Sequence, residues 1–141
     1  MAITSAICNS FKVEILTATH NFTASSGNTF NLALYTSSAT LNKSTTAYTT
    51  SNEVATATGY TAKGKALTSV TPVLSSDTAV CDFANVSWTS ASFTARGCLI
   101  FNDTATGDPA VCAIDFGGDK TVTSGTFTIE FPAASAGTAI I

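Results

Sequence analysis

The sequence predicts an all-β, mainly antiparallel domain, a β-sandwich or jelly-roll-like fold with one short N-terminal helix. About seven short segments alternate apolar and polar residues at spacings of about 8 to 15 residues, as in antiparallel sandwiches. Ser and Thr together make up 42 of the 141 residues. Thr favours exposed strand positions and Ser favours turns. No helix-sized pattern separates the segments, which argues against a parallel, doubly wound sheet.

The composition suits one β-sandwich domain spanning residues 1–141. Charged residues make up only 11% of the chain, against about 25% in typical soluble domains. Low charge is typical of surfaces that are buried against partners. The net charge is −3, and the six Lys and Arg residues form no run. A nucleic-acid partner is therefore not expected, because phosphate binding needs a clustered basic face.

Apolar residues recur every four positions near the N-terminus, which is the spacing of one face of a helix. They are Ile3, Ile7, Phe11 and Ile15. We expect a helix over about residues 4–16, with Thr4 or Ser5 as its N-cap. Its apolar stripe must pack against the body of the domain or against another subunit.

A period of two residues, typical of strands, follows this segment. The expected strands are, in order, residues 30–34, 66–73, 80–83, 86–88, 93–101, 110–116 and 127–131. Turn-forming residues separate them, among them residues 102–109 and the run from Gly117 to Asp119.

Two segments lack such a pattern. Residues 37–62 predict a long loop, in which a short helix near 48–55 is an alternative. A long irregular segment in a compact domain is usually functional or an interaction surface. Residues 133–141 end in two isoleucines. We expect this apolar tail to pack on a sheet edge or on a neighbouring molecule.

The four cysteines are Cys8, Cys81, Cys98 and Cys112. They form no C-x-x-C pair, and a single His cannot complete a zinc-finger pattern. Their neighbours are small or apolar, which predicts free, buried thiols that act as small hydrophobic groups. Disulfides, which suit an extracellular chain, and metal binding are the alternatives. No secretory signal and no apolar stretch of about 20 residues is visible, so we expect neither export nor a membrane helix.

Side chains that carry chemistry are scarce. His20 is the one histidine, and no nucleophile elbow or zinc-protease motif accompanies it. We therefore expect an ordinary loop histidine. Asp103, Asp108, Asp115 and Asp119 offer oxygens for calcium, but their spacing fits no known loop motif. We assign no catalytic, cofactor-binding or metal-binding residue and do not expect an enzyme.

Several stretches between residues 30 and 132 carry a resemblance. The longest are FNLALYTSSATL (30–41), FANVSWTSASFTARGCLIFN (83–102) and PAVCAIDFGGDKTVTSGTFTIEFP (109–132), and shorter ones are SNEV (51–54), GYT (59–61) and GKAL (64–67). Together they resemble a family of small structural proteins of tailed bacteriophages. The resemblance covers most of the chain and contains no catalytic signature.

The resemblance implies a virion structural protein, of the capsid decoration (cement) type or of the head- or tail-fibre type. It implies binding to the major capsid protein or to other virion proteins, a homo-oligomer, and assembly in the host cytoplasm. No cofactor, nucleic acid or membrane is implied. A reducing cytoplasm agrees with free thiols. The expected contact regions are the N-terminal helix, the loop at about 37–58 and the tail.

Two other functions are alternatives. A tail- or head-fibre module that binds a host surface glycan is suggested by aromatic residues that could stack on sugars. These are Trp88, Tyr35, Tyr48 and Tyr60, although an aromatic residue at strand period more often lies in the core. A glycan hydrolase would need two carboxylates that face each other across the sugar.

Overall fold

The computed structural model describes residues 2–57 and 59–133. Its elements in chain order are β1 (Ala6–Ile7), α1 (Asn9–Leu16), β2 (Phe30–Tyr35), β3 (Lys65–Ala66), β4 (Ser69–Ser75), β5 (Thr78–Phe83), β6 (Val86–Asn102) and β7 (Ala110–Ile129). All pairings between these strands are antiparallel. The all-β class and the short N-terminal helix are thereby confirmed.

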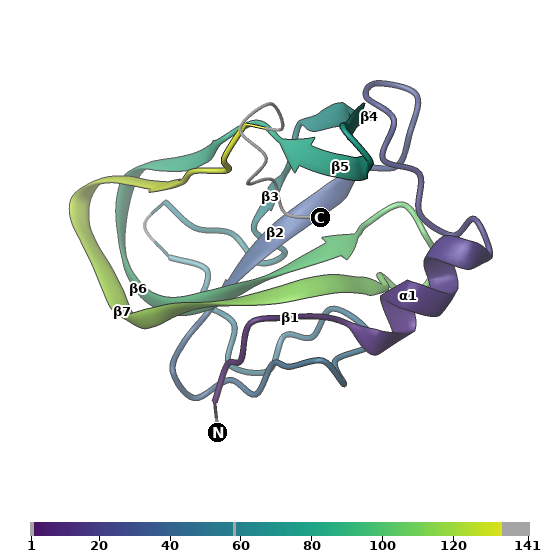
Figure 1. Cartoon of the computed structure of the whole chain (residues 1–141). Helices are drawn as coiled ribbons and strands as arrows, with labels where there is room; N and C mark the ends of the chain where they lie inside the picture. The colour runs from purple at the N-terminus through teal and green to yellow at the C-terminus, as the bar shows by residue number, and fades with distance from the viewer. Residues whose placement is uncertain (1, 58, 134–141) are drawn as a thin grey trace.

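One sheet forms most of the domain, with the strand order β1-β7-β6-β2-β3, while β4 and β5 pair only with each other. The long β6–β7 ribbon turns back over itself, so its two halves form opposite walls of the domain (Figure 1). Register shifts interrupt the ribbon between Trp88 and Ala91 and between Ala95 and Gly97. Such β-bulges bend a strand and increase its twist, which accounts for the turn of the ribbon.

The core surrounds β2, all six of whose residues are buried. On one face, Phe30 stacks on Phe22 at a centroid distance of 4.2 Å and contacts Phe83 at 5.9 Å. On the other face, Tyr48 from the following loop stacks on Phe101 at 4.7 Å. Because both faces of β2 are covered, its sequence is a continuous apolar run with only one polar residue.

The predicted helix over residues 4–16 is wrong at its start, because α1 begins at Asn9. The preceding residues join the sheet instead: Ala6 and Ile7 pair with β7, and Ile3 forms a bridge to Leu41. The hydroxyl of Ser5 accepts a hydrogen bond from the Asp115 N–H at 2.8 Å and caps no helix. The backbone N–H and C=O groups of this segment thus form hydrogen bonds to residues that are distant in the sequence, instead of the local bonds that a helix would provide.

The turn predicted from Gly117 to Asp119 is also wrong, because β7 runs through it without a break. Gly117 has a φ of +77°, and the register shifts between Gly97 and Ala95 on the facing strand. The glycines therefore mark a bulge, which is the other common use of glycine within a strand. The predicted break between residues 88 and 93 is also absent, because β6 runs through this segment with register shifts in place of a turn. The predicted strand 66–73 is divided between β3 and β4.

The long loop predicted at residues 37–62 is confirmed in its described part, and no helix forms near residues 48–55. The loop returns to the sheet at Gly64, which has a φ of +65°. A Cβ at this position would lie 1.8 Å from the carbonyl oxygen of Leu32. Glycine is therefore required where the loop meets β2.

Candidate interaction surface

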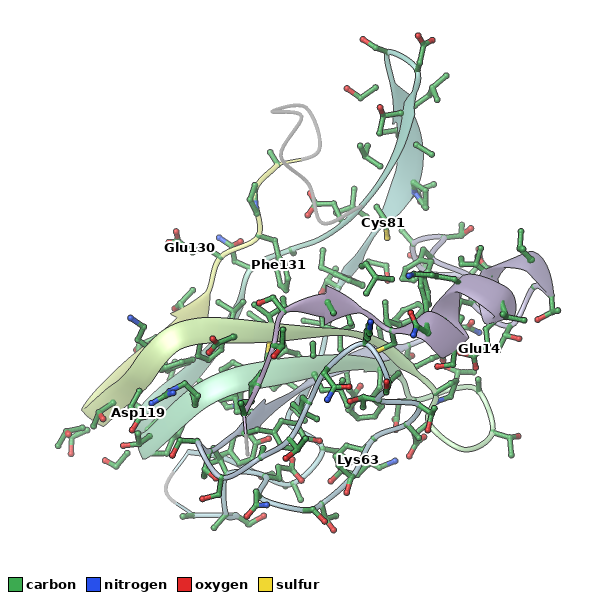
Figure 2. All side chains as sticks on the ribbon, turned by 60° about the horizontal axis from the view of Figure 1, so that its bottom comes forward. Glu14, Lys63, Cys81, Asp119, Glu130 and Phe131 are labelled. Carbon is green, nitrogen blue, oxygen red and sulfur yellow. The ribbon has the colours of Figure 1, made fainter. Side chains whose placement is uncertain are left out.

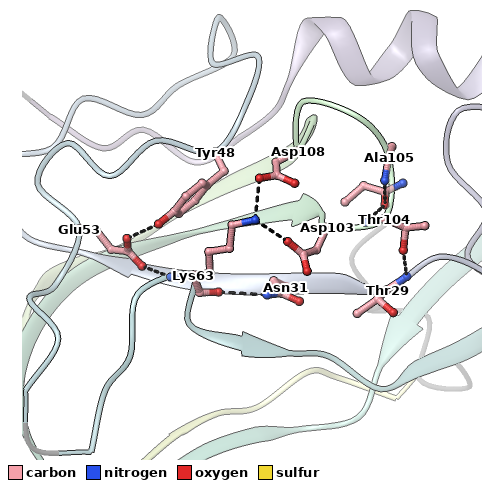
Figure 3. A network of polar contacts seen from close by, with 10 residues as sticks. Thr29, Asn31, Tyr48, Glu53, Lys63, Asp103, Thr104, Ala105 and Asp108 are labelled. Carbon is pink, nitrogen blue, oxygen red and sulfur yellow. Dashed lines mark hydrogen bonds and ion pairs between the residues drawn. The ribbon is translucent and has the colours of Figure 1, made fainter.

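A half-buried carboxylate joins the long loop to itself and to β2. Glu53 accepts hydrogen bonds from the Tyr48 hydroxyl at 2.6 Å and the Lys63 backbone N–H at 2.8 Å (Figure 3). It also accepts a hydrogen bond from the Tyr60 hydroxyl at 2.7 Å. The Tyr60 oxygen in turn accepts from the N–H of Leu34 at 2.9 Å. Burial, and then the hydrogen bond to Glu53, raise the pKa of Tyr48 to about 12. The phenol groups are protonated at neutral pH and act as donors.

The Lys63 side chain joins the same loop to the β6–β7 turn. Its Nζ lies 2.8 Å from both Asp103 Oδ1 and Asp108 Oδ2 (Figure 3). It also lies over the rings of Tyr48 and Phe101, at 5.6 and 6.0 Å from their centroids. The hydrogen bonds to the two aspartates raise the pKa of Lys63. Each charged group here has an opposite partner, so the arrangement is a clamp between two loops.

A second polar cluster surrounds Asn102, which is fully buried. Its amide nitrogen lies 3.0 Å from Asn28 Oδ1 and 3.2 Å from His20 Nδ1. Its oxygen accepts from the backbone N–H groups of Thr104 and Ala105 at 3.0 and 3.1 Å. These contacts hold the β6–β7 turn against the segment that follows α1.

The loop histidine belongs to this second cluster and is buried. The His20 ring lies 4.9 Å from that of Phe11, and its Nε2 lies 3.7 Å from Glu14 Oε1. Burial lowers the pKa of His20, although Glu14 opposes this effect. A neutral ring that accepts from Asn102 at Nδ1 carries its proton on Nε2, toward Glu14. The histidine thus supports the packing of α1 on the core.

The cysteines are free thiols in the structure, as the sequence predicts. Cys8, Cys98 and Cys112 are buried, and Cys81 is half-buried. Burial raises the pKa of Cys8 and Cys81 to about 11 and that of Cys112 to about 12. At neutral pH these groups remain uncharged and pack as small apolar side chains.

The exposed apolar residues, in contrast, lie on two elements that border one groove. Every large hydrophobic residue that is exposed in residues 2–57 and 59–133 lies on α1 or β4. They are Val13, Ile15 and Leu16 on the helix, and Val70, Val73 and Leu74 on the strand. Leu16 and Leu74 are exposed by 85% and 73%. An exposed cluster of this kind marks an interaction site more often than scattered apolar residues do.

A groove of about 430 Å³ separates the two elements. Its apolar walls come from Ile7, Phe11 and Ile15 on one side, and from Pro72, Val80 and Cys81 on the other. The β4–β5 hairpin stands away from the body of the molecule, with Cys81 near its base (Figure 2). We call this hairpin the arm, and the arm, α1 and the groove between them the apolar surface.

The aromatic residues that suggested a glycan site do not form an exposed platform. Trp88, Tyr35 and Tyr60 are exposed by no more than 2%, and Tyr48 is half-buried. Trp88 packs against Tyr60 at 6.1 Å and against Phe93 at 6.5 Å. These rings therefore fill the space between the ribbon and the loop.

The four aspartates considered for calcium are not brought together. Asp103 and Asp108 face Lys63, and Asp119 pairs with Arg96 at 2.9 Å. Asp115 Oδ1 accepts from the N–H of Gly117. Within the described residues, no group of three or more His, Cys, Asp or Glu side chains is placed to hold a metal ion.

The apolar surface includes α1, which belongs to one of the three segments expected to make contacts, the N-terminal helix. The loop at 37–58 directs its larger apolar groups inward, since Leu41 and Val54 are buried. Residues 134–141 of the expected tail lie outside the described residues. Sequence reasoning missed the arm, although the adjacent apolar pair Val73–Leu74, just before a turn, breaks the alternation of a one-sided strand.

Comparison with known proteins gives no identification: no family model, no curated protein and no solved structure matches the chain. None of the helices in the described residues has the length and apolar character needed to cross a membrane.

Proposed function

We propose that the chain is a non-enzymatic structural protein of a bacteriophage virion, a capsid decoration protein that binds the major capsid protein or neighbouring virion proteins and stabilises the shell. The observation that carries this proposal is the apolar surface. It gathers every exposed large hydrophobic residue of the described chain on α1 and β4. The resemblance of residues 30–41, 83–102 and 109–132 to phage structural proteins points to the same role.

The physical properties of the domain suit this role. Low charge reduces the cost of removing the surface from water, and apolar burial then drives association. A stable interface buries roughly 1,600 Å² in total. Repeated contacts on a lattice would add avidity to contacts that are individually small. The Glu53, Lys63 and Asn102 clusters hold the rest of the domain rigid, so little order is lost on binding.

Purified virions of the phage that encodes the chain test the proposal. Quantitative mass spectrometry should find the chain at a copy number that is a simple multiple of the capsid lattice. Electron cryomicroscopy should place it on the shell. Virions assembled with the Leu74→Asp chain should bind fewer copies and lose their genome at lower temperature than wild-type virions. Virions with Thr126→Asp, an equal charge change on exposed β7, are the control. Absence of the chain from the particle would refute the proposal, and its presence only in the tail would favour the fibre alternative.

A further inference from the structure

The single histidine of the chain is enclosed where α1, β2 and the β6–β7 turn meet. The His20 side chain is 0% exposed. Its ring lies 4.9 Å from that of Phe11 on α1 and 6.1 Å from that of Phe30 on β2. A charge in such surroundings is costly, because it loses its hydration. The ring can therefore hold a second proton only if neighbouring polar groups compensate for that loss.

Two polar side chains face the ring nitrogens. The amide nitrogen of Asn102 lies 3.2 Å from Nδ1 of His20. A carboxylate oxygen of Glu14 lies 3.7 Å from Nε2, which is too far for a hydrogen bond. Within residues 2–57 and 59–133, Glu14 is the one charged group that acts on the ring. The other side chains that pack against it are uncharged: Phe11, Phe22, Phe30 and Asn102.

The amide of Asn102 cannot turn to meet a protonated ring without losing other hydrogen bonds. Its oxygen accepts from the backbone N–H groups of Thr104 and Ala105 at 3.0 and 3.1 Å, and its nitrogen donates to Asn28 Oδ1 at 3.0 Å. This network places a donor beside His20, so Nδ1 of the neutral ring must accept. A second proton would place an N–H at Nδ1 against the N–H groups of Asn102.

We infer that this junction is an acid-sensitive switch: protonation of His20 breaks its contact with Asn102 and releases the β6–β7 turn from the segment that follows α1. The neutral ring accepts a hydrogen bond and holds the turn in place. In the protonated ring two donors face each other, so the ring and the amide must separate. The charge of Glu14 attracts the protonated ring and so opposes part of this effect.

The direction of the pH dependence follows from the burial of the ring. Burial lowers the pKa of His20 in the folded chain below its ordinary value of 6.5. As the pH falls, the unfolded chain therefore binds this proton first. The stabilisation from the neutral ring is complete above pH 6.5 and is lost progressively as the pH falls below that value.

The switch also affects the groove. Phe11, which contacts the His20 ring, forms part of the groove wall together with Ile15. Release of the ring should move this wall, so the apolar surface should bind its partner less tightly in acid than at neutral pH. Only this last consequence rests on the proposed function. The switch itself is a property of the isolated chain.

NMR titration of the whole chain tests the switch, because a single histidine gives one set of imidazole signals. From about pH 7.5 to about pH 4.5, His20 should titrate with a pKa below 6.5. As it does so, the Thr104 and Ala105 amides should lose protection against hydrogen exchange, after correction for the intrinsic rate. The Leu99 amide, in the centre of the sheet, should stay protected.

Two variants identify the groups responsible. Glu14→Gln removes the attracting charge and should lower the pKa of His20 by about 1. Glu130→Gln, the same charge change at an exposed position beyond β7, should leave it unchanged. In His20→Gln, whose fold circular dichroism checks, the protection of Thr104 and Ala105 should no longer fall in acid.

Three outcomes would overturn the inference. One is a His20 pKa at or above 6.5 in the folded wild-type chain. Another is protection of Thr104 and Ala105 that stays constant while His20 titrates. The third is a folded His20→Gln chain that still loses this protection in acid, because another group would then be responsible. Failure of the switch would leave the virion test unaffected, and absence from virions would leave these measurements unaffected.

Discussion

The loop at residues 37–64 and the β4–β5 arm contain similar hydroxyl-rich sequence but differ in how they contact the body of the domain. The loop packs its aromatic rings toward β2, its Glu53 accepts hydrogen bonds from Tyr48 and Tyr60, and its Lys63 pairs with two aspartates of the β6–β7 turn. The arm forms strand pairs only with itself and exposes Val73 and Leu74, while Phe83 at its base packs on Phe30. An irregular segment can thus be a fixed part of the core, while a regular hairpin can be the surface that is free to bind.

The largest effect should come from comparing a core leucine with an arm leucine. Leu99→Ala, at a fully buried position, should lower the free energy of unfolding by about 4 kcal/mol, because it removes buried methyl groups and leaves a cavity. Leu74→Ala should change it by less than about 0.5 kcal/mol when the chain is monomeric. Urea denaturation at low protein concentration measures both. Equal losses would mean that the arm belongs to the folded core and would contradict the comparison.

The next effect concerns the buried polar cluster. Asn102→Ala should lower the free energy of unfolding by about 3 kcal/mol, since it leaves buried groups, including the N–H groups of Thr104 and Ala105, without partners. Asn85→Ala is the matched control, because Asn85 is exposed and accepts one hydrogen bond, from the Phe131 N–H at 2.7 Å. That variant should lose about 1 kcal/mol or less. A small loss for Asn102→Ala would show that water replaces the amide.

The smallest effect per group is the pH dependence that the buried thiols confer. Their pKa values in the folded chain, about 11 for Cys8 and about 12 for Cys112, lie above the ordinary value of 9.0. The unfolded chain therefore releases these protons first, and stability that is complete below pH 9 is lost as the pH rises. We expect a loss of about 1 kcal/mol per thiol between pH 8 and pH 10.

Urea denaturation across this pH range checks the expectation. The Cys112→Ala chain, although less stable throughout, should lose less stability between pH 8 and pH 10 than the wild type. An identical pH dependence in the two chains would exclude a contribution from Cys112.

Local sequence patterns determined much of this protein. The alternation in residues 30–34 and 110–116, the absence of a period in residues 37–62 and the apolar neighbours of the cysteines predicted the strands, the loop and the free thiols. These features depend on side-chain period and backbone preference, which act over a few residues. For this reason the sequence alone also favoured a structural role over a catalytic one.

Only the tertiary structure decided how these elements are used. Ile3 and Ile7 follow a helical period, but Ile7 pairs with the edge of β7 and Ile3 forms a bridge to Leu41. Gly117 to Asp119 carry a turn signal, but a facing strand makes them a bulge. The apolar surface arises where α1 and β4, more than 50 residues apart in the chain, lie on either side of one groove. Long-range pairing and burial decide such features, and no local pattern records which partner a segment will meet.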